Sequence, residues 1–465
     1  MDTDLAFLPA VELARLVRAR QVSPVELLDG CLERIERLDS RVNSIVTVDA
    51  ERARETARAA EARAGDADTP AFHGVPIAIK DLHLTEGLRT TFGTKSLAGY
   101  VPDVDDESVR RIRDAGFVIV GKTNVPEFGS VPVTEPDLHG PCRNPWDTER
   151  TPGGSSGGAA AALAAGLVPI AHGSDGGGSL RIPASNCGVF GLKPARGRVS
   201  NGPLFGDRLA GLSVSGPVTR HVVDAGALLD VMAGYAVGDP HWAPPPARPF
   251  AEEAVLDPPP LRVGLVTTSP LTTLQPEVVA AAESAGRLLE GLGHTVEPFE
   301  LPVDQQLAAW FKVLWTVGIA ALPVDPATLE PFNAGLHERG SAVSAPQLMQ
   351  AVAGLQMATR SIVAASLAFD VVLSPTLGEP PLRIGEMAGL DVDAAFDRAT
   401  AYVGFTPVAN ITGQPAMSLP LGWSDDGLPL GVMVTGRPAD EATLLRLAGQ
   451  VQRAADWSHR RPEVS

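Results

Sequence analysis

Two hydrophobic patterns alternate along most of the chain. Apolar residues recur at helical spacing in residues 9–20 and 107–114, whereas residues 74–79 and 117–120 are short apolar runs typical of buried strands. Further elements are expected as strands at 261–266, 295–301, 370–376 and 428–437 and as helices at 276–292 and 441–457. Helices that alternate with buried strands predict an α/β fold, with a central mixed, mostly parallel twisted sheet flanked by helices on both faces.

The pattern gives no sign of a second domain. No internal repeat is present, and the late strands look like further members of the same core, so we expect one domain over residues 1–465. A proline-rich stretch at 235–261 predicts a surface excursion. Near the start, Ser23, Pro24 and Glu26 have the order of an N-cap and a first helical turn, which predicts that a helix begins there.

Composition and charge exclude several classes of protein. The 38 Lys and Arg residues against 55 Asp and Glu residues give a net charge of −17, which disfavours binding to nucleic acid or anionic lipid. Cys31, Cys142 and Cys187 are far apart and lack metal-ligand spacing. Neither a signal peptide nor an apolar run of membrane-spanning length is visible. We therefore expect a cytoplasmic protein with no nucleic acid and no membrane among its partners.

Residues 116–123 match the phosphate-loop pattern G-x-x-x-x-G-K-[ST] letter for letter. A phosphate loop needs a flexible turn that leads into a helix at its lysine. Here the residues between the glycines form an apolar, β-branched run, and Pro126 would interrupt a helix beginning at Lys122. The sequence therefore predicts a strand here and no nucleotide site.

Two glycine-rich turns carry serines. Residues 153–158 lead into an alanine-rich helix at 159–165 and place Ser155 and Ser156 at its N-terminus, where N–H groups favour negative charge. Residues 176–178 are three glycines before Ser179, which lets the backbone aim several N–H groups at one point, as an oxyanion hole requires. Taken singly, an ordinary N-cap and a flexible loop would explain the two turns equally well.

A serine nucleophile needs a base, and no histidine of this chain lies in a recognisable triad motif. Lys80 ends the apolar run that begins at Val75. Burial lowers the pKa of a lysine because it disfavours the charged form, and a neutral amine can accept a proton from a hydroxyl. Lys80 is therefore the candidate base.

Together these motifs resemble the amidase signature family. The resemblance rests on Gly-Val-Pro-Ile-Ala-Ile-Lys-Asp at 74–81, Gly-Lys-Thr-Asn-Val-Pro-Glu-Phe at 121–128, Arg-Asn-Pro-Trp-Asp at 143–147, Thr-Pro-Gly-Gly-Ser-Ser-Gly-Gly-Ala at 151–159, Gly-Gly-Ser-Leu-Arg-Ile-Pro-Ala at 177–184, Gly-Leu-Lys-Pro at 191–194 and Thr-Gly-Gln-Pro-Ala at 412–416. It spans roughly residues 5–457, with its core motifs at 74–194, and implies the amidase signature fold.

The resemblance also implies roles for individual residues. Ser179 would be the nucleophile that forms an acyl-enzyme, Ser155 the bridging serine 24 residues earlier, and Lys80 the base. The peptide bond before Ser155 would be cis. The N–H groups of Gly176, Gly177 and Gly178, together with that of Ser179, would form the oxyanion hole.

Three further residues are expected to support the site. Asp175 and Arg181 flank the nucleophile and could orient its loop through charge-assisted hydrogen bonds, although Asp175 could equally be a turn residue. Ser156 stands beside the bridging serine. Gly176 departs from the family, which commonly has Thr or Ile at this position, and predicts a more flexible loop.

The activity that the resemblance implies is hydrolysis of a C–N bond without metal or cofactor. We expect small, hydrophobic amides as substrates, with carbamates (urethanes) and esters as side substrates. The pocket is expected from two variable segments, residues 129–139 and 301–355, the second made apolar by Trp310, Phe311, Trp315, Phe332 and Met349. Two alternatives stay open: a glutamine-hydrolysing component of a tRNA-dependent amidotransferase, and a hydrolase of cyclic, lactam-like amides. Dimers are common in the family, so a homodimer is compatible with the sequence, which does not determine the oligomeric state.

Overall fold

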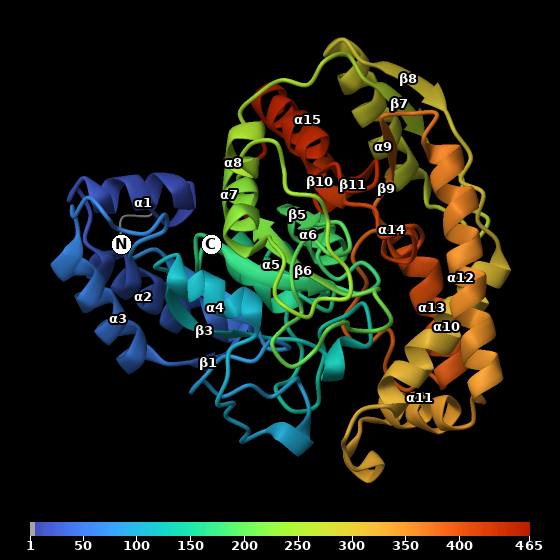
Figure 1. The fold of residues 1–465 in the computed structure, drawn as a ribbon, viewed down its shortest axis with the longest axis horizontal. Coiled ribbons are helices and arrows are strands. Elements are labelled where there is room, and N and C mark those ends of the chain that lie inside the picture. Colours follow the sequence, from blue (N-terminus) through green and yellow to red (C-terminus); the bar gives the residue numbers. More distant parts are fainter. Residues whose placement is uncertain (1–4) are drawn as a thin grey trace.

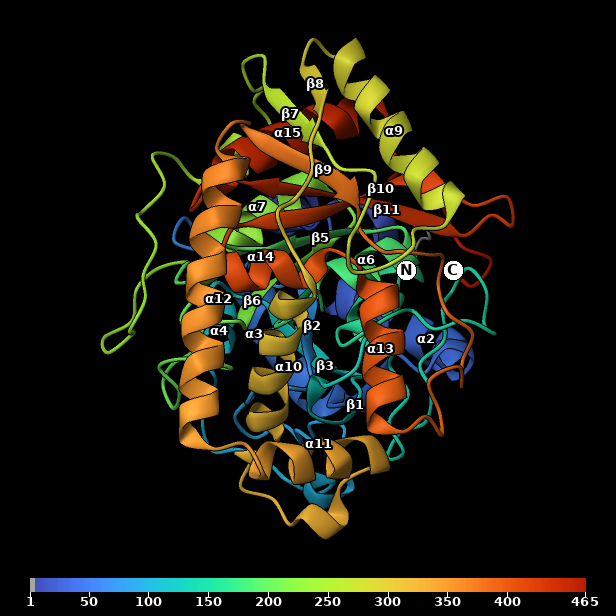
Figure 2. The same ribbon diagram turned by 90° about the vertical axis from the view of Figure 1, so that its right-hand side faces the viewer.

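One twisted sheet of eleven strands runs through the computed structural model, which describes residues 5–465. Figure 2 shows the sheet from β8 near the top to β1 near the bottom. In spatial order the strands are β1 (Ile45–Val48), β3 (Val118–Thr123), β2 (Pro76–Lys80), β4 (Ala171–Asp175), β6 (Val214–Thr219), β5 (Phe190–Lys193), β10 (Ala416–Trp423), β11 (Pro429–Gly436), β9 (Val371–Pro375), β7 (Arg262–Leu265) and β8 (Thr295–Pro298).

The sheet is mixed, as predicted, but the expectation that it is mostly parallel is wrong. Parallel pairs occur near the two ends, where β3, β2 and β4 and then β9, β7 and β8 lie side by side. The middle, from β4 through β6, β5, β10 and β11 to β9, is antiparallel. The hairpin of β10 and β11 explains part of this, because a short loop can join only antiparallel neighbours.

Helices cover both faces of the sheet and share a hydrophobic core with its strands on each face. One face carries α1 (Ala10–Arg18), α4 (Glu107–Asp114), α7 (Val222–Met232), α8 (Phe250–Glu253), α9 (Pro276–Gly291) and α15 (Glu441–Ala454). The other carries α2 (Pro24–Val42), α3 (Ala50–Arg63), α5 (Gly157–Ala164) and α6 (Arg181–Cys187), with α14 (Thr406–Thr412) against the far end of the sheet. Short 3-10 turns lie at Leu5–Phe7, Lys95–Leu97, Glu127–Gly129 and Pro326–Thr328.

Four helices form a further layer away from the N-terminal helices. They are α10 (Gln305–Ala320), α11 (Pro331–Ser341), α12 (Ala345–Ser366) and α13 (Val392–Val403), and they stand together at the right of Figure 1. Within this layer α10 packs against both α11 and α12, and α12 packs against α14. The layer therefore connects the outer helices to the face of the sheet that carries α5 and α6.

Local signals in the sequence agree with the observed helix starts. The Ser23 hydroxyl accepts hydrogen bonds from the N–H groups of Val25 (3.0 Å) and Glu26 (3.4 Å), and Pro24 occupies the first helical position. This arrangement satisfies N–H groups that the first helical turn leaves without partners. The predicted beginning of α2 is thereby confirmed.

The phosphate-loop letters form a strand, as predicted. Residues 118–123 are β3, and Lys122 is fully buried within it, where its ammonium donates hydrogen bonds to the hydroxyls of Thr85 (2.9 Å) and Thr90 (3.0 Å). A lysine held in this way inside a strand does not begin a helix over a phosphate. The match is therefore one of letters alone.

The proline-rich stretch is mostly exposed coil over residues 235–249, after which Phe250 in α8 is buried. Among residues 5–465, none of the helices combines the length and the apolar character needed to cross a membrane.

Candidate active site

Lys80 lies at the end of β2 with its side chain buried (1% exposed). Side chains alternate along a strand, so Lys80 shares a face with Ala78, which belongs to the core beneath α5, while Ile77 and Ile79 point to the opposite core. The parallel neighbours β3 and β4 enclose β2 on both sides. The side chain of Lys80 therefore points into the protein interior, below the N-terminus of α5.

The amine of Lys80 contacts the first of the two adjacent serines. Its Nζ donates hydrogen bonds to Ser155 Oγ (2.9 Å) and to the carbonyl oxygen of Ser174 (3.0 Å). Burial lowers the pKa of Lys80 to about 7, an effect that the charge of Asp175 only partly opposes. Near neutral pH the amine is therefore substantially uncharged and can act as a proton acceptor.

The peptide bond between Gly154 and Ser155 is cis, as expected. Ser156 follows at the N-cap of α5, and its hydroxyl donates to the carbonyl oxygen of Ser174 (3.1 Å) rather than capping the helix. The next two residues must be small: a methyl group added at Gly157 would lie 2.2 Å from Thr134 Oγ1, and one added at Gly158 would lie 2.4 Å from the Asn124 backbone nitrogen. The glycines of the motif therefore allow α5 to begin close against its neighbours.

Ser179 lies in the loop between β4 and α6 and faces a cavity. It is 8% exposed, and within residues 5–465 its hydroxyl forms no hydrogen bond, including none to Ser155. A backbone hydrogen bond links the two serine-containing turns: the N–H of Ser156 donates to the carbonyl oxygen of Ser179 (3.2 Å). The structure thus brings Lys80 into direct contact with Ser155 and holds Ser179 beside them through main-chain contact.

Residues 176–179, which carry the expected nucleophile and are here called the nucleophile loop, have N–H groups that differ in availability. The N–H of Gly178 donates to Asp175 Oδ1 (2.7 Å), so it is already occupied. Those of Gly176, Gly177 and Ser179 have no acceptor among residues 5–465. Of the N–H groups expected to form an oxyanion hole, that of Gly178 is therefore occupied within the loop, and the other three are free within the part of the chain that the structure describes.

Asp175 holds the loop together from within the core. Its carboxylate accepts hydrogen bonds from the N–H groups of Gly178 and Leu180 (3.1 Å), from Arg181 Nε (3.0 Å) and Nη2 (2.9 Å), and from Asn410 Nδ2 (2.9 Å). Burial alone would raise the pKa of Asp175, but the charge and hydrogen bonds of Arg181 outweigh it and hold this pKa well below its usual range. The Asp175 carboxylate that orients the loop is therefore charged near neutral pH.

Two residues of α14 complete this arrangement and were not singled out by the sequence. The hydroxyl of Thr406 donates to the carbonyl oxygen of Gly177 (2.7 Å), and Arg181 Nη1 donates to the carbonyl oxygen of Thr406 (2.8 Å). Asn410 Nδ2 also donates to the backbone carbonyl of Asp175 (3.0 Å). A polar Asn inside a short buried helix was the available signal, because such a side chain needs internal partners.

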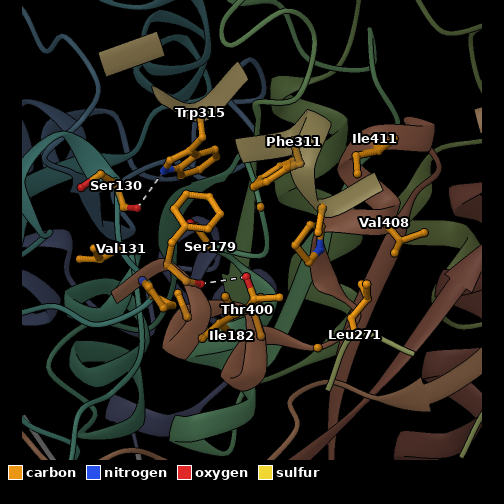
Figure 3. Close-up of a pocket in the computed structure, with 18 of the residues that line it drawn as sticks. Ser130, Val131, Ser179, Ile182, Leu271, Phe311, Trp315, Thr400, Val408 and Ile411 are labelled. Atoms are coloured by element: carbon orange, nitrogen blue, oxygen red, sulfur yellow. Dashed lines mark hydrogen bonds between the residues drawn. The ribbon is translucent and has the colours of Figure 1, made fainter. Parts of the chain in front are cut away.

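A cavity opens at Ser179, and none of the residues that line it carries a charge. The expected region 301–355 supplies Leu307, Phe311, Trp315 and Phe332, but Met349 is 65% exposed and does not line the cavity. Residues 129–132, at the start of the other expected segment, also line the cavity, together with Gly177 and Ile182 beside Ser179. The sequence did not indicate the remaining walls, which come from α13, α14 and Leu271. Figure 3 shows Trp315 and Phe311 along one wall near Ser179, with Leu271, Val408 and Ile411 farther along the pocket.

Gly178 and Gly176 in this loop are expected to tolerate alanine very differently. Gly178 has φ +133°, and an added methyl would lie 2.2 Å from Thr406 Oγ1, whereas one at Gly176 meets Leu209 and Trp315 at ordinary distances of 3.4 and 3.6 Å. We expect Gly178→Ala to lower kcat/KM by about 100-fold or more, because the added methyl would shift the loop and displace the free N–H groups of the neighbouring residues. We expect Gly176→Ala to lower it by less than about tenfold. Steady-state kinetics on folded variants tests this, and a larger loss for Gly176→Ala would refute it.

Comparison with known proteins shows the family to which this chain belongs. The family model described as Amidase matches residues 26–445. The 6-aminohexanoate-cyclic-dimer hydrolase of Paenarthrobacter ureafaciens is 36% identical, with 98% of this chain and 96% of that protein covered. A solved structure of 6-aminohexanoate cyclic dimer hydrolase superposes with a TM-score of 0.93 at 36% identity, with 99% of each chain covered.

Two more distant structures share the whole fold. A bacterial aryl acylamidase of the amidase signature family has a TM-score of 0.88 at 26% identity, with 97% of each chain covered. A glutamyl-tRNA(Gln) amidotransferase chain from Thermotoga maritima has a TM-score of 0.83 at 30% identity, with 100% of this chain and 99% of that chain covered.

Proposed function

Because this chain belongs to the amidase signature family and is a hydrolase of amides, we propose that it cleaves small, uncharged, apolar amides through an acyl-enzyme on Ser179. The observation that carries the substrate class is the cavity at Ser179, whose described lining is apolar apart from the hydroxyls of Ser130, Ser179 and Thr400. Such a lining stabilises hydrocarbon and leaves a charged substrate group without a partner.

In the first step Ser179 Oγ attacks the amide carbonyl carbon. Ser155 accepts the proton of Ser179 and passes its own proton to the neutral amine of Lys80 across the 2.9 Å contact that the two already make. The missing hydrogen bond between Ser179 and Ser155 is compatible with this relay, because catalytic contacts often tighten only when substrate is bound.

The free N–H groups of Gly176, Gly177 and Ser179 stabilise the negative oxygen that forms during the attack. The proton then travels from Lys80 through Ser155 to the leaving nitrogen, and the C–N bond breaks. Water attacks the ester on Ser179 in the second half of the cycle, with Lys80 and Ser155 again accepting and returning a proton. Every step uses side chains and backbone N–H groups of this chain, together with water.

The pH dependence follows from the state of Lys80. Because burial lowers the pKa of Lys80 to about 7, the amine is protonated and unable to act as base below that pH, and neutral above it. We expect kcat/KM to rise about tenfold per pH unit up to about pH 7 and then to level off. A profile that stays flat down to about pH 5 would exclude Lys80 as the base.

The two adjacent serines provide a matched comparison. Ser155 accepts the hydrogen bond of Lys80, whereas Ser156 donates to a backbone carbonyl outside the relay. We expect Ser155→Ala to lower kcat/KM by about 100- to 1,000-fold and Ser156→Ala by about tenfold or less. If Ser156→Ala is the more damaging change, the bridging role belongs to Ser156.

A cyclic amide is a second candidate substrate. Ring closure removes the free amino and carboxyl groups of a linear oligomer, so a cyclic amide suits an uncharged cavity. Two of the relatives described above are named for a 6-aminohexanoate cyclic dimer. Carbamates and activated esters present a carbonyl to the same serine and are expected as side substrates.

Free glutamine fits this cavity poorly. It carries an ammonium and a carboxylate, and the described lining offers no charged partner for either. Burying an unpaired charge costs several kcal/mol. We therefore do not assign the role of the amidotransferase chain to this protein, despite the shared fold.

The purified chain and its Ser179→Ala variant should be assayed on one panel: a neutral anilide, an aliphatic primary amide, an aryl carbamate, the 6-aminohexanoate cyclic dimer and free glutamine. The proposal predicts turnover of at least one uncharged substrate that disappears in the variant, and no turnover of glutamine. Hydrolysis of glutamine alone would overturn the substrate class, and turnover that survives in Ser179→Ala would overturn the mechanism.

A further inference from the structure

We propose that Phe311 and Trp315, here called the aromatic ledge, form a subsite that selects substrates with a flat, uncharged ring attached to the reacting amide. The inference deepens the proposed function and rests on it in one respect, the position of the reacting carbonyl at Ser179. It commits to aryl amides within the broader class of apolar amides.

The ledge is a rigid unit. Phe311 and Trp315 are four residues apart on α10, so their side chains lie on the same face of the helix. Their rings stack with centroids 5.1 Å apart and an interplanar angle of 26°. The indole Nε1–H of Trp315 donates to the carbonyl oxygen of Ser130 (3.0 Å), which fixes the orientation of the larger ring.

The ledge lies directly over the nucleophile loop. A methyl group added at Gly177 would lie 3.3 Å from Phe311 Cζ and 3.7 Å from Trp315 Cη2, and one added at Gly176 would lie 3.6 Å from Trp315 Cη2. These two glycines carry free N–H groups that we assign to the oxyanion. A group bonded to the reacting carbonyl is therefore close to the rings, as the placement of Trp315 and Phe311 near Ser179 in Figure 3 also indicates.

The small residues below the ledge make room for it. Because the added methyl groups would already touch the rings, a branched side chain at Gly176 or Gly177 would displace them. Glycine at these two positions of the loop therefore leaves room for the two large rings on α10. The departure at Gly176 therefore has a structural counterpart in Trp315.

Aromatic faces favour other flat rings. Stacked or edge-to-face ring pairs are stabilised beyond the burial of their area, by an amount that corresponds to roughly a three- to tenfold change in binding. Leu271, Val408 and Ile411 also line the pocket and offer no such preference, because aliphatic side chains bind saturated and flat groups alike. Phe332 and Phe396 are the other aromatic residues of the lining, so a variant at one of them is needed to assign the discrimination between flat and saturated rings to the ledge.

The test compares benzanilide with its saturated counterpart, N-cyclohexylcyclohexanecarboxamide, in equilibrium dialysis against the Ser179→Ala protein. Binding is measured in this background, so the result does not depend on turnover. The same measurement is made after adding Trp315→Leu or Phe311→Leu. The control is Phe396→Leu, which alters a ring of the same pocket that lies on α13 and packs against the Lys312 ammonium at 4.9 Å.

We expect the preference for benzanilide over the saturated amide to fall by about three- to tenfold in both ledge variants and to be retained in Phe396→Leu. Trp315→Phe, which keeps a ring, should retain most of the preference. An unchanged preference in both ledge variants, or an equal loss in Phe396→Leu, would overturn the proposal. If the ledge result holds while the wild-type chain hydrolyses no amide, the mechanism fails and the subsite stands.

Discussion

Ser179→Ala is expected to abolish amide hydrolysis, with a loss in kcat/KM on the order of 10⁴- to 10⁶-fold. The reason is chemical: without Oγ no acyl-enzyme can form, and only binding and the oxyanion donors remain to assist direct attack by water. The measurement is release of a chromogenic amine from a neutral anilide by wild-type and variant proteins at equal concentration.

Ser174→Ala is the matched control for this experiment. Ser174 lies on β4 five residues before Ser179, and the structure uses its carbonyl oxygen, which accepts from Lys80 and Ser156, rather than its hydroxyl. Removing the hydroxyl leaves that carbonyl in place, so activity should stay within about tenfold of wild type. A Ser179→Ala protein that keeps a tenth of wild-type activity would show that this serine is not the nucleophile.

Lys80→Met is expected to lower kcat/KM by about 10³- to 10⁴-fold, which is the upper part of the contribution that a general base makes. Methionine fills much of the same buried volume but accepts no proton from Ser155. The loss should be accompanied by a changed pH profile, because the group whose pKa of about 7 governs the rise is gone. Rates measured from about pH 5 to pH 9 supply both readouts.

Lys122→Met separates the role of a base from that of a buried amine. Lys122 is as deeply buried as Lys80, on the neighbouring strand, and burial lowers its pKa to about 8. Its hydrogen bonds go to Thr85, Thr90 and a backbone carbonyl, none of them part of the relay. We expect lower stability but a retained pH profile, and equal kinetic losses in the two variants would contradict the assignment of Lys80.

The elements with strong periodicity were predictable from the sequence. The helices α2, α4 and α15 and the strand β2 lie where apolar spacing and capping residues placed them. Lys80 was identifiable because a lysine that ends a fully apolar strand has no exposed surface to occupy. The serines of the two glycine-rich turns were identifiable because glycine at these positions permits backbone conformations and close contacts that other residues do not.

The middle of the sheet was not predictable in the same way. The strand β4 consists of Ala-His-Gly-Ser-Asp and β5 of Phe-Gly-Leu-Lys, neither of which has an apolar run or a regular alternation. These strands are buried because other parts of the chain cover them, which is information that no local window contains. Most of the antiparallel pairs involve at least one strand without such a local pattern, so the sequence suggested a more parallel sheet than the structure has.

The site, like the sheet, was predictable where neighbouring residues determine it and not where residues distant along the chain do. The order of glycines suggested an oxyanion loop, but only the structure shows that Asp175 occupies the N–H of Gly178. Thr406 and Asn410 support this loop from more than 220 residues away along the chain. The far wall of the cavity likewise comes from α13, which packs against α11, and from α14, which packs against α12, and these contacts exist only in the folded chain.

The central claim, an acyl-enzyme on Ser179, is tested most directly by locating the acyl group. The chain is mixed with a 4-nitrophenyl ester of an apolar acid, quenched in acid during turnover, digested with trypsin and analysed by fragmentation mass spectrometry. No Lys or Arg lies between Arg150 and Arg181, so Ser155, Ser156, Ser174 and Ser179 fall in one peptide and must be distinguished by their fragments. We expect the acyl mass on Ser179. An adduct on one of the other three serines, or steady turnover with no acylated peptide, would contradict it.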